Sequence, residues 1–136
     1  MSSNPYATYR SVEATTADPI TLTTMLFDGG SKALKKAVIH FESGNRNGFN
    51  DETNRAYLII GELLSTLDMS QGELSSNLAG IYGYCLRLIV ESSIGDMDKL
   101  REVDRHLTTI AGAWKTATAD LKVARAPQRL GAEAAA

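Results

Sequence analysis

The sequence is poor in the residues that most often cross-link a chain or perform chemistry. Its 136 residues include one cysteine, two histidines and three prolines. A single cysteine cannot form an internal disulfide, so we expect a reducing compartment. Cys85 lies in the apolar run IYGYCLRLIV with no histidine or acid nearby in sequence. This setting indicates a small core residue rather than a nucleophile.

Long apolar runs and dense positive charge are also missing. No run approaches the roughly 20 apolar residues that cross a bilayer. The first residues do not resemble a signal peptide. We therefore expect a cytoplasmic protein without membrane insertion. The formal net charge is −2 and the densest basic stretch is KALKK, which argues against a dedicated nucleic-acid binder.

Motifs for metals and catalysis are absent as well. Di-iron bundles require two Glu-x-x-His motifs, whereas neither His40 nor His106 follows a glutamate at that spacing. Glu102 precedes His106 by one helical turn, which is weak support for a metal site. FDGGSK lies inside a helical pattern rather than between a strand and a helix, so it is not a phosphate loop. We expect no catalytic residue, no metal and no cofactor.

Four segments carry apolar residues at helical spacing. The first begins at Asp18, a natural N-cap before Pro19, and we expect it to stop at Gly44 and Gly48. We expect the others over residues 51–67, with Asn50 or Asp51 as the cap, over 73–93, and from 96 to 125. The expected seams of these three helices are Ala56, Ile60, Leu63 and Leu67; Leu74, Leu78, Ile81, Cys85, Leu88 and Ile89; and Leu100, Val103, Leu107, Ile110, Trp114, Ala117 and Leu121.

These segments, with no convincing strand, predict an all-α fold. Short breaks between long helices favour an antiparallel up-down four-helix bundle. We expect an N-terminal arm with a short helical turn over residues 1–17, the bundle over residues 18–124 and a flexible tail over residues 125–136. Trp114 lies on the seam of the last helix, so we expect it in the core.

Five glycines within the expected helices are not explained by a bundle core. Gly29, Gly30, Gly61, Gly80 and Gly83 each cost a helix about 0.5–1 kcal/mol relative to alanine. They indicate either close approach between helices or a groove in which another chain lies.

Apolar residues away from the seams favour the groove. Leu86 and Val90 are one turn apart on the third helix and are turned about 100° or more from its seam. Tyr57 and Leu58 are similarly displaced on the second helix. A patch shared by two neighbouring helices would be an interaction surface. The alternative is that the bundle packs more widely at these positions.

Several segments together resemble the flagellin-specific export chaperone family of bacterial flagellar secretion, the FliS family. They are NPYATY, TADP, MLFDGG, IIGELLSTLD, NLAGIYGYCLRL and AGAW, and they span roughly residues 4–122 in the family's order. Two features depart from the family pattern. Phe27 stands where the family more often has tyrosine, and the alanine-rich tail matches nothing in the pattern.

The resemblance implies a non-enzymatic bundle that binds the disordered C-terminal segment of flagellin in the cytoplasm. Such a protein prevents early polymerisation of flagellin and helps to deliver it to the flagellar export gate. We then expect Tyr57, Leu58, Leu86 and Val90 to contribute to the client groove. A homodimer is a further candidate state of the protein in the absence of client. A helical adapter or secretion regulator with a folded partner, and a ligand- or metal-binding bundle, are the alternatives.

The N-terminal stretch NPYATYR adds two candidate partner-binding residues, Tyr6 and Tyr9. Asn4 and Pro5 form a cap and a first-turn proline, so a helical turn would carry Tyr6, Tyr9 and Val12 along one side. We expect this arm to cover part of the client groove when flagellin is absent and to yield when it arrives. The alternative is that both rings permanently cap the core.

Overall fold

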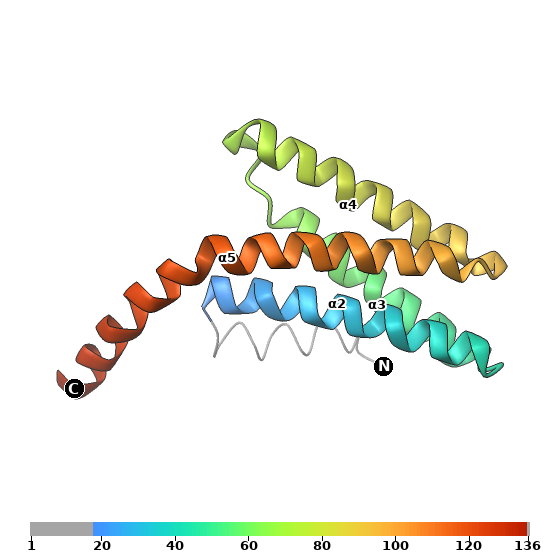
Figure 1. Ribbon diagram of the computed structural model, residues 1–136, viewed down its shortest axis with the longest axis horizontal. Coiled ribbons are helices and arrows are strands. Elements are labelled where there is room, and N and C mark those ends of the chain that lie inside the picture. Colours follow the sequence, from blue (N-terminus) through green and yellow to red (C-terminus); the bar gives the residue numbers. More distant parts are fainter. Residues whose placement is uncertain (1–17, 136) are drawn as a thin grey trace, which may run out of the picture.

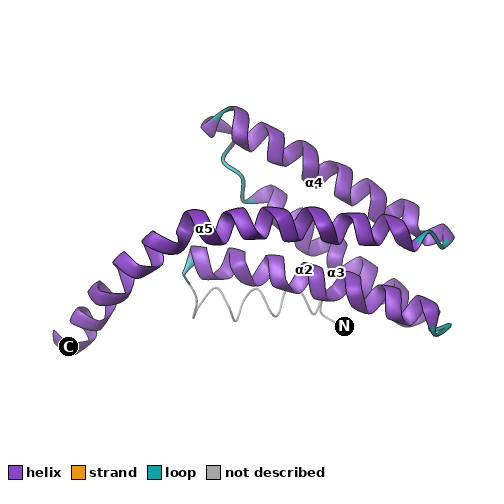
Figure 2. Cartoon of the chain, in the orientation of Figure 1, coloured by secondary structure: helices purple, strands orange, loops and turns teal. Residues whose placement is uncertain are grey.

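The structure, a computed structural model, describes residues 18–135, with side chains placed from Asp18 to Leu121 apart from residue 71. This part of the chain folds into four α-helices and contains no strand (Figure 2). They are α2 (Pro19–Glu42), α3 (Arg46–Ser65), α4 (Glu73–Glu91) and α5 (Met97–Ala135), with 3₁₀ turns η1 (Met69–Gln71) and η2 (Ser92–Ile94) on either side of α4. Successive helices run in opposite directions (Figure 1), which confirms the all-α four-helix fold.

The first helix begins where the sequence predicts. The Asp18 carboxylate accepts a hydrogen bond from the Thr21 backbone N–H at 2.8 Å, and Pro19 occupies the first turn. The helix ends before Gly44, whose φ of 77° is a left-handed conformation that glycine adopts at little cost. Its buried residues occupy a wide face, as the pattern indicated: Ile20, Leu26, Phe27, Gly30, Ala33, Leu34 and Ala37.

The second helix begins earlier than the sequence predicts. We expected its cap at Asn50 or Asp51, but α3 starts directly after Asn45, whose side chain accepts the Gly48 N–H at 3.0 Å. Gly48 therefore lies in the first helical turn and is not a stop signal. A Cβ at this position would come within 2.6 Å of His40 Nδ1 and 2.7 Å of Asn45 Nδ2, so a larger residue would displace these two side chains. The glycines and asparagines of this stretch resemble a long loop in sequence, which is why the prediction was wrong.

The core lies where α2 packs against α3 on one side and α5 on the other. The wide apolar face of α2 is therefore shared between two neighbours. The largest fully buried side chains are Phe49, Leu26, Leu34, Ile60, Leu63, Leu100, Leu107, Val103 and Cys85. Cys85 is thus a core residue, as its surroundings in sequence indicated.

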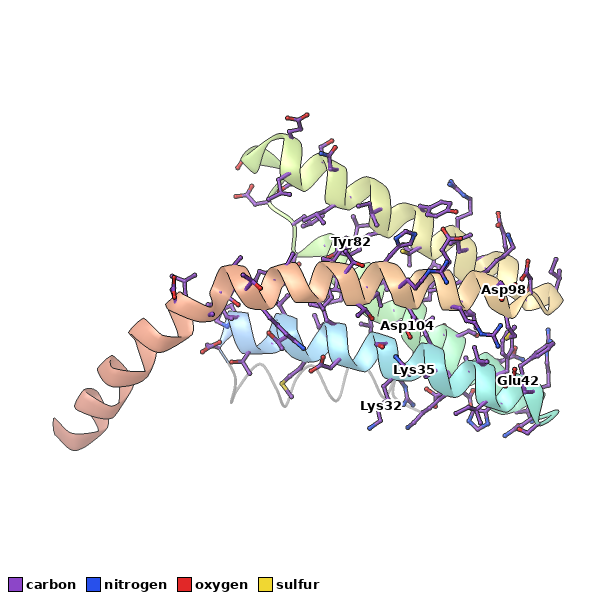
Figure 3. All side chains as sticks on the ribbon, viewed as in Figure 1. Lys32, Lys35, Glu42, Tyr82, Asp98 and Asp104 are labelled. Atoms are coloured by element: carbon purple, nitrogen blue, oxygen red, sulfur yellow. The ribbon has the colours of Figure 1, made fainter. Side chains whose placement is uncertain are left out.

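Polar contacts fix the position of α5 along α2. Lys35 Nζ lies 2.7 Å from Asp104 Oδ2 (Figure 3), and the Ser31 hydroxyl donates to the same carboxylate. Nearer the start of α2, the Trp114 Nε1–H donates to Thr24 Oγ1 at 3.0 Å. Trp114 is half-buried against the core, which agrees with its expected place on the seam.

Helix α5 continues past Arg125, where we expected it to end, and its backbone is helical to Ala135. Figure 1 shows this last part running beyond the ends of the other helices. None of the helices described by the structure is long and apolar enough to cross a membrane.

Candidate partner-binding surfaces

Helix α4 carries an apolar seam that its neighbours cover along only half of its length. Figure 1 shows α4 and α5 meeting at η2 and separating towards the start of α4. Cys85 and Leu88 are almost fully buried, whereas Leu74 is 70% exposed and Ile81 is 36% exposed. All four residues lie on one seam with spacings of seven, four and three. The expected burial of Leu74 and Ile81 was wrong. Ser75 and Tyr82, each one position further along, are buried instead, so in this half of α4 the buried face is turned by about 100° from the predicted seam.

The seam of α5 changes in the same way. Leu107 is fully buried, while Leu121 is 51% exposed. Ile110 follows His106 by one turn, and the His106 ring meets Tyr84 of α4 with ring centroids 6.1 Å apart. Ile110 therefore faces α4, and so does Leu121, which lies about three turns further along.

The exposed residues of the two seams, together with the half-buried Leu78 and Ile110 that pack against the core, form one apolar surface at one end of the bundle. We call it the open seam: Leu74, Leu78 and Ile81 of α4, with Ile110 and Leu121 of α5. Its residues repeat at the spacing of a helix interface, so it continues the packed interface of the other end. An additional helical segment that lies between α4 and α5 would complete that interface.

A second surface lies over the outer sides of α3 and α4 and contains the residues predicted from sequence. Val90 is 60% exposed and Tyr57 is also exposed. Leu58 and Leu86 are half-buried, and Leu86 packs against the core. We call these four residues the outer patch. Tyr6 and Tyr9 lie outside the described residues.

The relative position of α3 and α4 brings the two halves of the outer patch to a similar height. The Arg46 guanidinium donates to the Ser93 carbonyl oxygen at 2.8 Å, which fixes the start of α3 beside the end of α4. Because the two helices are antiparallel and rise about 1.5 Å per residue, Tyr57 lies at about the level of Tyr82, which is one helical turn from Leu86.

The five helical glycines divide into two kinds. A Cβ at Gly30 would lie 3.1 Å from Leu107 Cδ1, so this glycine serves close packing of helices, whereas one at Gly29 would make an ordinary van der Waals contact of 3.5 Å with Ile59 Cδ1. A Cβ at Gly61, Gly80 or Gly83 would meet nothing within 4 Å. No neighbour in the described part of the chain requires these three glycines. Because they have no side chains, they leave shallow positions on the surfaces of α3 and α4.

A polar cluster joins α4 to α5 where the two helices begin to diverge. It consists of Tyr84, Glu102 and His106, with His106 Nε2 3.2 Å from Glu102 Oε2. A hydrogen bond to Glu102 raises the pKa of Tyr84. Hydrogen bonds from Tyr84 and His106 lower the pKa of Glu102. The cluster therefore favours the ionised carboxylate and links the two helices at the edge of the open seam.

The packed side of α4 is apolar and protects its titratable groups from solvent. Burial raises the pKa of the Cys85 thiol to about 11, which makes it a poor nucleophile at neutral pH. Burial also raises the pKa of Tyr82 to about 12. Figure 3 shows Tyr82 between α4 and the rest of the bundle. Among residues 18–121, no three histidine, cysteine or acidic side chains gather in a possible metal site.

Sequence reasoning missed the open seam as a surface. Its residues occupy the same seam positions as core residues, so their spacing predicts burial. A weaker signal was present in the first turns of α4, which read ELSSNLAG and offer only two large apolar side chains. The later turns, IYGYCLRLIV, offer far more apolar area for packing. Helix α4 accordingly packs against its neighbours mainly through its C-terminal half.

The chain is similar to known proteins over most of its length. Residues 2–121 match the family described as Flagellar protein FliS. A flagellar secretion chaperone FliS from Bacillus subtilis (strain 168) is 35% identical over 115 residues, which cover 84% of this chain and 86% of the relative. The protein of the same name from Salmonella typhimurium is 34% identical over 102 residues, 73% of this chain and 76% of the relative. That from Escherichia coli (strain K12) is 34% identical over 97 residues, 69% and 71% of the two chains.

Proposed function

The chain belongs to the FliS family of flagellar secretion chaperones, and from this premise we propose that it binds the disordered C-terminal segment of flagellin in the cytoplasm. By holding that segment, it prevents premature polymerisation and assists delivery to the flagellar export apparatus. Components of the export gate are its second partners. The family is one of chaperones rather than enzymes, and its role is therefore binding.

The observation that carries this proposal is the open seam. Soluble proteins rarely expose apolar residues at helix-interface spacing on two facing helices unless another chain covers them. A disordered segment that folds on binding loses conformational entropy and must bury a long apolar strip in compensation. The open seam offers such a strip, and its spacing fits an amphipathic helix.

The outer patch extends the surface available to the client. Tyr57 and Val90 are exposed on neighbouring helices. Gly61 and Gly83 have no side chains, so the backbone of a bound segment can approach closely at these positions. We assign Tyr57, Leu58, Leu86 and Val90 to contacts with a second stretch of the same client. Tyr6 and Tyr9 would contact the client once it is bound.

A pair of substitutions in the open seam tests the proposal. The variant Leu74→Asp/Ile81→Asp places charge on two exposed positions, so the bundle should keep its helicity while flagellin affinity falls at least a hundredfold. A matched control is Ile39→Asp, because Ile39 is 63% exposed on α2, away from both surfaces. Affinities are measured by calorimetric titration of flagellin, with helicity followed by circular dichroism. Equal affinity in the two variants would contradict the assignment of the open seam.

The alternative partner is a folded protein bound by a helical adapter. Binding to a flagellin that lacks its C-terminal segment distinguishes the chaperone from the adapter, because a chaperone of that segment no longer binds the truncated flagellin. Full capture of the truncated flagellin would favour the adapter. Light scattering on the client-free protein shows whether the open seam also mediates a homodimer.

A further inference from the structure

A groove between α2 and α3, which we call the α2–α3 groove, shares no residue with the open seam or the outer patch. Its volume is about 560 Å³, and it is lined by α2 residues between Met25 and Lys36 and by Glu52, Arg55 and Ile59 of α3. Tyr57 of the outer patch is two residues from Ile59, which is about 200° around the helix axis. The groove therefore lies on the opposite side of α3 from the outer patch.

The basic stretch KALKK divides between two sides of α2. Lys35 pairs with Asp104 of α5 at 2.7 Å, whereas Figure 3 shows Lys32 pointing away from α5. Lys32 and Lys36 line the groove, and neither forms an ion pair or a hydrogen bond with a residue that the structure describes. Because the two ammonium groups are one helical turn apart, they repel each other. A negatively charged occupant of the groove would relieve this repulsion.

The acidic residues of the groove already have cationic neighbours. Asp28 Oδ1 lies 3.5 Å from Lys115 Nζ of α5, and Glu52 Oε1 lies 3.7 Å from Arg55 Nη1. The charges that lack a counter-ion within the described part of the groove are therefore positive, although the formal net charge of the whole chain is −2. Charge complementarity thus favours an acidic occupant.

The inner surface of the groove adds two requirements. Leu26, Ala33 and Ile59 make it apolar. Glu52 is 9% exposed, and its Oε1 atom accepts no hydrogen bond from the described residues. A buried carboxylate oxygen in this state is costly. The occupant should therefore bring apolar atoms and an N–H or O–H donor in addition to its negative charge.

An extended peptide segment meets all three requirements. Unlike a helix, it has backbone N–H groups that are free to donate, and its alternate side chains point to opposite faces. Apolar side chains can then face the inner surface while acidic ones face the lysines. From Met25 to Lys36 the groove follows α2 for about 16 Å. This is the length of about five residues in extended conformation.

We propose that the α2–α3 groove binds an acidic, extended segment of a partner protein other than the client. Acidic side chains of this segment lie beside Lys32 and Lys36, and one of its backbone N–H groups donates to Glu52. Because the groove is separate from the open seam and the outer patch, the protein holds this partner and its client at the same time. The proposal goes beyond the chaperone function and does not depend on what the open seam binds.

A peptide of sequence Glu-Leu-Glu-Leu-Glu, blocked at both ends, is the probe, and it is titrated into the isotope-labelled full-length protein by NMR. We expect amide shifts in residues 25–36 and 52–59. The variant Lys32→Glu/Lys36→Glu should bind the probe at least tenfold more weakly, because like charges then face each other. The matched control Arg87→Glu/Arg105→Glu reverses two exposed charges outside the groove and should bind within twofold of wild type. Circular dichroism verifies folding.

A second probe tests the hydrogen bond to Glu52. The same peptide with N-methylated backbone nitrogens has no amide donor, so it should bind the wild-type protein about tenfold more weakly. In Glu52→Leu the two probes should bind equally, because the acceptor is gone. Should Glu52→Leu unfold, the lysine variant and the N-methylated probe decide.

Competition with flagellin tests the separation from the client. The probe should bind equally well in the presence of saturating flagellin and in the variant Leu74→Asp/Ile81→Asp, so that the outcome is independent of the assignment of the open seam. Displacement by flagellin would assign the groove to the client and overturn the proposal. Absence of probe binding, wild-type affinity in the lysine variant, or equal affinities of the two probes for the wild-type protein would overturn it as well.

Discussion

The two ends of the α4–α5 pair have apolar residues at the same spacing, but these residues are buried at one end and exposed at the other. At the closed end, near η2, Leu88 and Leu100 are buried, and Lys99 Nζ lies 3.0 Å from Glu91 Oε1. At the open end, Leu74 and Leu121 extend the same seams into solvent. The difference teaches that spacing determines which side of a helix is apolar, whereas the packing of a third element determines whether that side is buried.

The largest expected effect is the difference in lost stability between a substitution at a buried position and one at the open end. Leu107→Ala removes a fully buried side chain, and we expect it to lower the free energy of unfolding by about 2–5 kcal/mol. Leu74→Ala changes an exposed position and should cost at most about 0.5 kcal/mol. Urea denaturation of both variants measures the contrast. Similar losses in the two variants would show that the open seam is packed in solution.

The next comparison lies within the outer patch. Leu86 packs against the core, so Leu86→Asp buries an unpaired charge and should destabilise the bundle by roughly 3 kcal/mol or more. Val90 is exposed, and Val90→Asp should change stability by about 0.5 kcal/mol or less while it weakens flagellin binding. Thermal denaturation and titration with flagellin are measured on both variants. A folded Leu86→Asp protein would contradict the packing of Leu86.

The smallest effect concerns alkaline pH and the packed side of α4. Burial raises the pKa of Cys85 from 9.0 to about 11 and that of Tyr82 from 10.0 to about 12. Between these values the folded state binds more protons than the unfolded state, so stability falls as pH rises from about 9 to 11. For Cys85 the slope is at most about 1.4 kcal/mol per pH unit.

The alkaline effect is measured as the free energy of unfolding at pH 8 and pH 10.5. Cys85→Ala should flatten the decline, whereas Leu74→Ala at the open end should leave it unchanged. A decline of the same size in Cys85→Ala would assign the effect to other groups.

Much of the architecture was predictable because helical spacing and caps are local properties. The Asp18–Pro19 start of α2 and the core position of Cys85 both follow from neighbouring residues. The start of α3 was not predictable, because the His40 side chain of the preceding helix fills the space beside Gly48. Nor was the open seam, since the exposure of Leu74 depends on which face α4 turns towards its neighbours, where Ser75 is buried instead. Burial of Tyr82 was missed because its ring lies beside the expected seam.

The short connection between α2 and α3 has a consequence for the order of folding. Only residues 43–45 join these helices, so the loop-closure entropy of pairing them is small. By contrast, the contact between Ser31 and Asp104 joins residues 73 positions apart. Local contacts form faster than distant ones, and the N-terminal part of a chain leaves the ribosome first. We therefore expect the α2–α3 hairpin to assemble during synthesis, and the surface at Gly30 that receives Leu107 to wait for the last helix.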